Sequence, residues 1–148
     1  MQIENLSPEE CKVVLAANRL ARLACCRDNQ PYIVPIYYAY ADDSLFAFSV
    51  PGKKIDWMKA NPRVSVLVEQ HGDGRQWQSV VVDGRFEELS DRIGHKRERE
   101  HAYSLLSKHS QWWEPGELKP VSPPPPEIGY PVFFRISTDR MSGRRAKE

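Results

Sequence analysis

Hydrophobic residues along the chain fall into short runs bounded by turn-forming residues, a pattern typical of a β-rich protein. Two of these runs, Pro31–Tyr40 and Leu45–Ser49, are rich in the β-branched and aromatic residues that suit a pleated, half-buried surface. Asp42, Asp43 and Ser44 stand between them, and such residues favour turns because their side chains bond nearby backbone groups. The pattern therefore predicts that the two runs form a β-hairpin.

Four further apolar runs predict strands. They are Leu20–Cys26, Val64–Glu69, Trp77–Leu89 and Tyr130–Ser137. Periodicity alone does not separate strand from helix in the first of them, but the turn signal that follows it favours a strand. Gly84, inside the third, indicates a bulge or a bend of the kind with which barrels turn corners. With the hairpin, these runs predict a mostly β fold, an antiparallel barrel with helices at its ends.

Three segments predict those helices. Ser7–Glu10 supplies an N-cap serine, a proline at the first helical position and the glutamate of a capping box, for a helix ending near Ala17. Ile55–Asn61 is short and amphipathic, and Pro62 ends it. Ser90–His109 is highly charged with a thin apolar stripe, which predicts a surface helix capped by its first serine.

Residues 110–128 predict a proline-rich connector within the domain. Its Pro123–Pro126 run favours an extended conformation that cannot sit inside a sheet. A rigid connector is favoured over a ligand for a proline-binding module, because the run lies between two structured segments. Thr138–Glu148 is expected to be a tail that is mobile at its very end.

Composition and charge mainly exclude certain classes of protein. The length of 148 residues predicts a single domain over residues 1–148. A net charge of +1 gives no overall field that would attract nucleic acid or an anionic membrane. No apolar run approaches the roughly 20 residues of a membrane helix, and the N-terminus lacks the pattern of a secretory signal. Three cysteines indicate reduced thiols in a cytoplasmic protein rather than a disulfide framework.

Candidate chemistry is concentrated after the second strand of the hairpin. Ser49, Gly52, Lys53 and Lys54 precede a helix, so a hydroxyl, backbone N–H groups and two ammonium groups converge on a plausible anion site. A solvated basic turn explains this stretch alone equally well. The sequence has no metal-ligand spacing, nucleophile elbow or phosphate-binding glycine loop, which disfavours hydrolysis and ATP use, although a triad built from distant residues stays open. The histidines of the charged segment are interpreted as surface residues.

Three segments, in this order, resemble the pyridoxamine 5′-phosphate oxidase-like family of FMN-binding split barrels. Pro31–Tyr37 resembles the P-x-x-V-P strand of that family. Leu45–Ser49 followed by Gly52-Lys53-Lys54 resembles its strand with a terminal Ser or Thr and its G-[RK]-K turn. Trp77–Arg85 resembles its S-V-x-x-x-G strand. The chain looks closest to the small branch that includes nitroimidazole-resistance proteins, and the resemblance implies a six-stranded antiparallel split β-barrel.

The resemblance also implies a homodimer with two FMN sites at the subunit interface, with each flavin held by residues of three groups. Val34–Tyr37 would line the flavin, Ser49 and Lys54 with Lys53 would hold the phosphate, and Gln78 and Ser79 would approach the ring or the ribityl chain. The implied cofactor-binding residues are Val34, Pro35, Ile36, Tyr37, Phe48, Ser49, Lys53, Lys54, Gln78 and Ser79. Charged and hydroxyl donors of this kind suit a phosphate monoester.

Two departures from the family pattern limit the predicted reaction. No arginine starts the strand at Pro31–Tyr37, which argues against pyridoxamine phosphate oxidation, and Phe48 stands where a histidine accompanies nitroimidazole-resistance activity. The first hypothesis is an FMN-dependent oxidoreductase of unknown substrate, with no predicted catalytic side chain. The alternatives are a non-catalytic flavin carrier or sensor, a barrel that binds deazaflavin or haem, and an interaction module that uses Trp112-Trp113 and the proline run.

Overall fold

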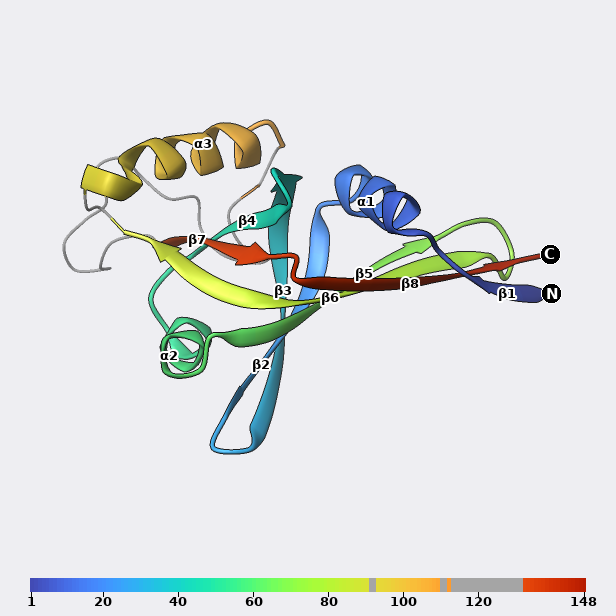
Figure 1. The fold of residues 1–148 in the computed structure, drawn as a ribbon, viewed down its shortest axis with the longest axis horizontal. Helices are drawn as coiled ribbons and strands as arrows, with labels where there is room; N and C mark the ends of the chain where they lie inside the picture. The colour runs from blue at the N-terminus through green and yellow to red at the C-terminus, as the bar shows by residue number, and fades with distance from the viewer. Residues whose placement is uncertain (91–92, 110–111, 113–131) are drawn as a thin grey trace.

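The structure is a computed structural model that describes residues 1–90, 93–109, 112 and 132–148 (Figure 1). The strands are β1 (Gln2–Asn5), β2 (Leu20–Arg27), β3 (Gln30–Ala41), β4 (Ser44–Ser49), β5 (Arg63–His71), β6 (Trp77–Leu89), β7 (Val132–Ser137) and β8 (Arg140–Lys147). The helices are α1 (Pro8–Ala17), α2 (Lys53–Ala60) and α3 (Lys96–Leu106), with the 3-10 turn η1 (Ile93–His95) before α3. The expected mostly β fold is confirmed.

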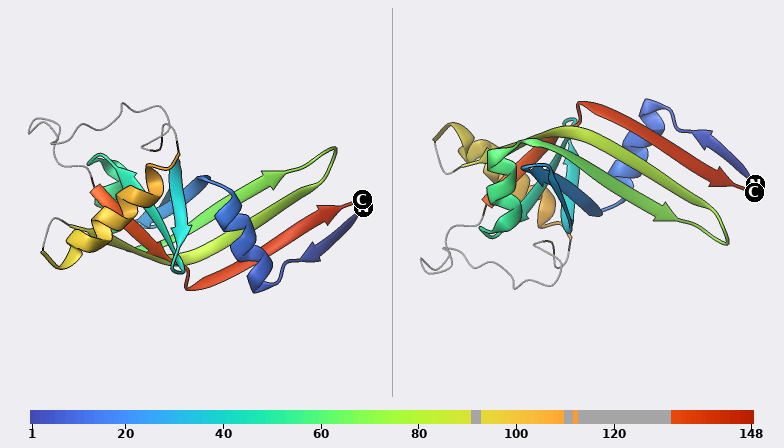
Figure 2. Two further views of the ribbon diagram at one scale, coloured as in Figure 1. Left: turned by 90° about the horizontal axis from the view of Figure 1, so that it is seen from above. Right: turned by 90° about the horizontal axis from the view of Figure 1, so that it is seen from below.

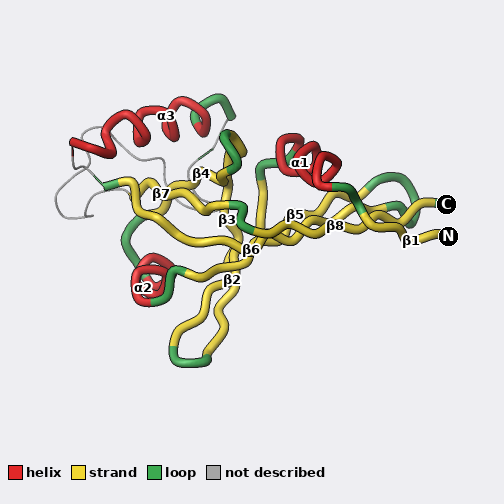
Figure 3. Tube along the Cα trace, in the orientation of Figure 1, coloured by secondary structure: helices red, strands yellow, loops and turns green. Residues whose placement is uncertain are grey.

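Six strands close into an antiparallel barrel, as the sequence predicted. The strands form one eight-stranded sheet in the order β1-β8-β6-β5-β2-β3-β4-β7, and an additional pairing of β6 with β7 closes the ring. β8 and β1 lie outside the ring and widen the sheet beyond β6. Figures 1 and 3 show this arm of the sheet extending from the barrel, with both chain termini at its far end.

Two tight turns set the register of the β2–β3–β4 meander. Asp28 and Asn29 have φ values of 51° and 65°, and Asp42 and Asp43 have φ values of 53° and 54°. Two-residue turns with positive φ at both positions match the right-handed twist of the flanking strands, and Asn and Asp tolerate this conformation better than other non-glycine residues. The turns therefore place Leu23 opposite Val34 and Tyr40 opposite Leu45.

At Gly84, β6 exchanges one neighbouring strand, β8, for another, β7. The predicted bend at this glycine is confirmed. Residues 77–83 of β6 pair with β8, whereas residues 86–89 pair with β7. A Cβ at Gly84 would lie 1.7 Å from the carbonyl oxygen of Ser137, so the two backbones approach too closely for any side chain. The glycine thus allows the β7–β8 turn to pack directly on β6.

The helices cover different parts of this framework (Figure 2). α1 begins with the predicted capping box at Ser7 and lies across the sheet arm, where its Cys11, Val14 and Leu15 are buried. Tyr38 fixes α1 to the barrel, because its hydroxyl donates to the Leu15 carbonyl at 2.7 Å. Among the described residues, no helix is long and apolar enough to cross a membrane.

Four segments differ from the sequence prediction. The tail predicted over Thr138–Glu148 is wrong, since Arg140–Lys147 forms β8 between β6 and β1, and mobility at its very end stays a prediction. The first strand, β1, was not predicted. The helix expected from Ile55 begins at Lys53, and the one expected from Ser90 becomes η1 and α3, with His95 as N-cap of α3. Most of the proline-rich connector lies outside the described residues, and the single-domain assignment stays a prediction.

Candidate functional site

The Ser49–Lys54 corner, where β4 ends and α2 begins, brings together a hydroxyl and an ammonium group. Ser49 is completely buried, and its Oγ donates to the Val50 carbonyl at 2.8 Å. Lys54 is the second residue of α2, and its Nζ donates to the same Oγ at 2.8 Å. The structure therefore places two of the expected phosphate-binding residues in direct contact.

The N-terminus of α2 adds backbone donors to this corner. A helix leaves its first N–H groups without intrahelical partners, and side chains, water or ligands satisfy them. At α1, Ser7 and Glu10 do so reciprocally, with hydrogen bonds of 3.0 and 3.1 Å. At α2 the N-cap is Gly52, which offers no side-chain hydrogen bond. The positive end of α2 therefore lies beside Lys54 without a side-chain hydrogen bond from its N-cap residue, an arrangement that favours an anion.

Lys53 lies apart from Ser49 and packs against two aromatic rings. Its Nζ is 4.3 Å from the ring centroid of Tyr32 and 4.7 Å from that of Trp57. Trp57 lies four residues further along α2, so the two side chains share a face of the helix. In this arrangement the Lys53 ammonium group lies over the Tyr32 and Trp57 rings, and of the two lysines it is Lys54 that contacts the Ser49 hydroxyl. The four-residue spacing of Lys53 and Trp57 on α2 is the signal in the sequence for this contact.

Val34–Tyr37 lies on the part of β3 where the barrel is split. β2 pairs with β3 along this segment, but β4 pairs with β3 only from Tyr38 onward. One edge of Val34–Tyr37 therefore has no neighbouring strand among the described residues. Ile36 is buried in the core, whereas Pro35 is exposed and Val34 and Tyr37 are half-buried. Backbone groups and the alternate side chains of this edge are thus the parts that can contact a ligand.

Phe48 points away from the Ser49 hydroxyl. Its ring packs in a buried cluster with Leu106 and Trp112, 5.4 Å from the Trp112 ring and 5.3 Å from that of Phe133. Successive side chains of a strand face opposite ways, so Phe48 and Ser49 occupy different faces of β4. The structure gives Phe48 a packing role between β4 and α3, and it buries Trp112, one of the two tryptophans of the interaction-module hypothesis.

Gln78 and Ser79 lie far from the Ser49–Lys54 corner. They belong to the start of β6, which pairs with β8 near the chain termini, whereas α2 lies at the other end of β6 (Figure 1). Ser79 lines a cleft of about 400 Å³ with Met141 and Arg144. Gln78 lines a smaller one of about 240 Å³ on the other face of the strand. The structure therefore does not bring these two residues to the other candidate residues within one chain.

The buried Cys25 and Tyr38 are not activated as nucleophile or acid. Burial raises the pKa of the Cys25 thiol, and the neighbouring Cys26 raises it further, more than the charges of Lys53 and Lys54 lower it. Burial also raises the pKa of Tyr38. All three cysteines are free, in agreement with the predicted reduced thiols. The raised pKa values of Cys25 and Tyr38 favour their protonated forms, which fits structural rather than catalytic roles.

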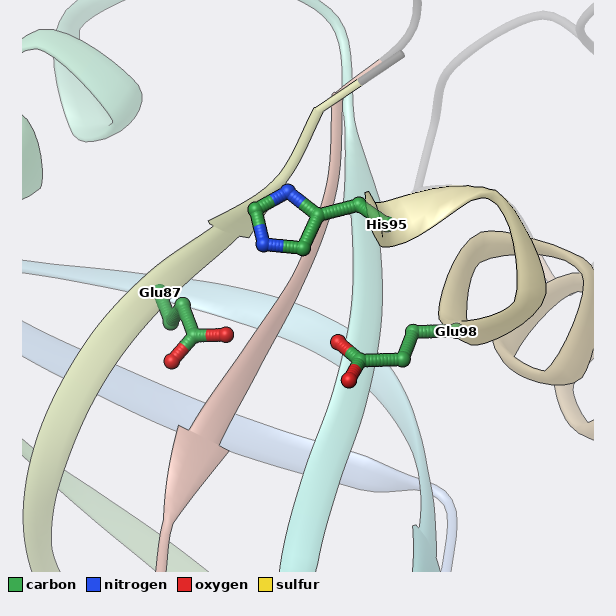
Figure 4. Close-up of side chains that lie close together, drawn as sticks. All are labelled: Glu87, His95 and Glu98. Atoms are coloured by element: carbon green, nitrogen blue, oxygen red, sulfur yellow. The ribbon is translucent and has the colours of Figure 1, made fainter. Parts of the chain in front are cut away.

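One group of residues offers metal-ligand atoms that the sequence did not indicate. Figure 4 shows Glu87 of β6 and Glu98 of α3 approaching the ring of His95, and their ligand atoms lie within 4.8 Å of one another. Arg135 already engages both carboxylates, at 2.8 Å from Glu87 and 3.5 Å from Glu98. His95 Nδ1 accepts from the Ser90 N–H at 3.2 Å. With this arginine in place the group is an ion-pair network that joins α3 to the sheet.

The closed ring with its split edge defines an antiparallel split β-barrel. A family model described as pyridoxamine 5′-phosphate oxidase matches residues 7–145. The chain therefore belongs to the pyridoxamine 5′-phosphate oxidase family, as its motifs indicated.

Individual relatives agree with this assignment. An uncharacterized protein of Rhizobium meliloti (strain 1021) is 52% identical over 99% of this chain and 97% of its own length. The crystal structure of a FAD-binding protein from Mesorhizobium loti is 57% identical, covers 100% of this chain and 99% of its own, and has a TM-score of 0.83. A protein from Bacteroides thetaiotaomicron described as a 5-nitroimidazole antibiotic resistance protein shares the fold, with 16% identity, coverage of 100% and 93%, and a TM-score of 0.72.

Proposed function

We propose that the chain binds a flavin nucleotide, either FMN or the FMN half of FAD, and acts as a flavin-dependent oxidoreductase on a small molecule. The observation that carries the proposal is the Ser49–Lys54 corner, where a buried hydroxyl, an ammonium group and the uncapped N-terminus of α2 meet. This donor set fits a phosphate monoester. The 57% identical Mesorhizobium loti protein is described as FAD-binding, which supports a flavin here.

Each part of the chain has a distinct task in this proposal. Ser49, Lys54 and the first N–H groups of α2 hold the phosphate. The free edge of β3 at Val34–Tyr37 lies against the ring system and offers backbone groups to it. A bound flavin supplies the redox chemistry, and the protein supplies binding, orientation and the exclusion of water. Lys53 supports the corner through Tyr32 and Trp57.

The separation of Gln78 and Ser79 from this corner supports a homodimer with the flavin at the subunit interface. If both groups contact one flavin, they come from different copies of the chain. The outer face of the sheet offers a surface for that contact, because Leu20, Ile33 and Val81 are 46%, 65% and 39% exposed on it. Their registers place all three on the same face of β2, β3 and β6. Exposed apolar side chains on one face of the sheet are where we place the contact with a second copy of the chain.

The decisive experiment is purification of the full chain, followed by absorption spectroscopy and chromatography of the released cofactor. A flavin spectrum and a released compound that co-elutes with FMN or FAD support the proposal and identify the nucleotide. Colourless protein that binds neither added FMN nor added FAD contradicts it. Bleaching by a nicotinamide donor with repeated turnover in air favours the oxidoreductase, and bound flavin without turnover favours a carrier or sensor.

A complementation experiment tests the shared site. Lys54→Ala and Ser79→Trp variants each damage a different half of the proposed flavin contacts. If the halves come from different subunits, mixing the two variants under subunit exchange restores some intact flavin sites. Flavin binding that stays lost in heterodimers, with each variant folded by circular dichroism, contradicts an interface site. Sedimentation of the unmodified protein as a monomer contradicts the homodimer directly.

A further inference from the structure

A second basic site lies on the outer face of the sheet, outside the residues proposed to hold the flavin. It is a cleft of about 600 Å³, within the range of cavities that hold small metabolites. Its walls come from β2, β3, β5, β6 and the β7–β8 turn. We call it the arginine cleft, because Arg63, Arg85 and Arg140 line it.

The sheet register gathers the three arginines on one face. Arg63 of β5 lies directly opposite Arg85 of β6, and Arg140 of β8 lies opposite Asp83 of β6. Like charges directly opposite each other in an antiparallel pair destabilise the sheet, so the Arg63–Arg85 pair carries a cost in the unliganded protein. The Gly84 corner adds to the cleft, because it lets the β7–β8 turn approach and bring Asp139 and Arg140 to its rim.

The guanidinium groups of the cleft form no ion pair with a carboxylate of the described residues. Within the described part of the chain, no carboxylate lies within ion-pair distance of Arg63, Arg85 or Arg140. The nearest acidic neighbour in register, Asp83, instead accepts a hydrogen bond from Ser65 at 2.6 Å. By contrast, Arg22 on the same face pairs with Glu69 at 3.2 Å.

We propose that the arginine cleft binds the oxyanion group of a small metabolite, a phosphate ester or a carboxylate. Guanidinium groups present planar, paired N–H donors that match both groups. Ala24, Pro31 and Val64 form an apolar wall for the remainder of such a molecule. Asp83 and Asp139 at the rim disfavour ligands with several anionic groups, so the ligand carries one such group beside a compact body.

Within one chain, the arginine cleft shares no residue with the proposed flavin contacts. Pro31 lines the cleft, whereas the next residue of β3, Tyr32, contacts Lys53 on the other face of the strand. Successive residues of a strand face opposite ways. The cleft and the Ser49–Lys54 corner of the same chain therefore lie on opposite sides of the β2–β3 hairpin, so a substitution in one does not remove residues of the other.

The test is a titration of ¹⁵N-arginine-labelled full-length protein with inorganic phosphate and, separately, with acetate at constant ionic strength, followed through the Nε–Hε signals of the three arginines. Saturable shifts of these signals are expected. An Arg63→Gln/Arg85→Gln double variant is expected to weaken phosphate binding at least about tenfold, as befits charge-assisted hydrogen bonds. Arg75→Gln, in the exposed β5–β6 loop, is the matched control and binds like the unmodified protein.

Further variants and ligands test whether the arginine cleft is an oxyanion site. Lys54→Ala leaves phosphate binding at the cleft signals unchanged, which separates this site from the flavin site. Tighter phosphate than acetate indicates a phosphate ester, and the reverse indicates a carboxylate. Shifts that grow linearly without saturation, or equal binding by the double variant, overturn the proposal. A change of oligomeric state in the double variant also overturns it, since the arginines would then serve contacts between subunits.

Discussion

In the Ser49–Lys54 corner both lysines have partners, a hydroxyl for one and two aromatic rings for the other. In the arginine cleft none of the three guanidinium groups has a carboxylate partner among the described residues. The corner is built from one short segment, residues 49–54, whereas the cleft joins residues 63, 85 and 140 across three strands. The first is organised locally before a ligand arrives, and the second depends on the tertiary fold and on a ligand to offset its charge.

The largest expected effect is on stability, at Gly84, where the backbones of β6 and the β7–β8 turn come together beside the cleft. Gly84→Ala places a Cβ 1.7 Å from the Ser137 carbonyl oxygen, so β6 or the β7–β8 turn has to move. We expect the free energy of unfolding to fall by about 3 kcal/mol or more. Denaturant unfolding measures this loss.

Gly72→Ala is the control for that substitution, because its Cβ would make an ordinary contact of 3.5 Å with Gln76. It is expected to change stability by less than about 1 kcal/mol. If the two variants were equally stable, the close packing of the β7–β8 turn on β6 would be wrong.

The next effect separates the two lysines of the corner. Lys54→Ala removes a charged donor from the proposed phosphate site and is expected to weaken flavin binding by about 1.5–3 kcal/mol. Lys53→Ala removes a charge that lies over Tyr32 and Trp57, so its effect on binding is expected to stay below about 1 kcal/mol. Fluorescence titration of the apoprotein with flavin measures both. A larger loss for Lys53→Ala would reverse the assignment of the two lysines.

The contrast between corner and cleft also explains what the sequence could predict. The capping box at Ser7, the bend at Gly84 and the strands of the barrel follow from local chemistry, and the structure confirms them. The contact of Lys54 with Ser49 could be predicted because Lys54 comes only five positions after Ser49. The different contacts of Lys53 and Lys54 could not be predicted in this way, because Tyr32, which contacts Lys53, lies on β3 and not on α2.

The parts that sequence reasoning missed depend on long-range pairing. Arg140–Lys147 has the composition of a polar tail, and it becomes a strand only because β6 and β1 offer it edges to pair with. The arginine cleft likewise requires the register of Arg63 with Arg85, which no local pattern reveals. Gln78 and Ser79 were placed with the flavin by resemblance, and a single chain keeps them apart from Lys54.

A smaller effect tests the cost of the unpaired charges. Arg63→Gln removes one member of the like-charged Arg63–Arg85 pair, so without phosphate the variant is expected to gain about 0.2–1 kcal/mol in unfolding free energy. Arg22→Gln, which removes the exposed pair with Glu69, is expected to lose about 0–1 kcal/mol. Denaturant unfolding in chloride buffer measures both signs. Destabilisation by Arg63→Gln would show that Arg63 has a favourable role without a ligand.

The smallest effect concerns an arginine that is paired. The backbone N–H of Ser7, followed by Arg145, lowers the pKa of Glu10, and Lys147 and Arg145 lower that of Glu4. A carboxyl whose pKa is lowered by folding stabilises the protein above its unfolded pKa, and this contribution disappears as the pH falls through the folded pKa.

Stability is therefore expected to decline on acidification through and below the usual glutamate range, and Arg145→Gln is expected to make that decline shallower. Arg140→Gln is the matched control on the same strand, because no carboxylate lies within ion-pair distance of Arg140 in the described residues, and it is expected to keep the slope of the unmodified protein. Denaturation midpoints at a series of pH values measure the slopes. Equal slopes for the two variants would mean that Arg145 contributes no more than Arg140 to the pH dependence of stability. The contrast between paired and unpaired arginines would then have no energetic consequence.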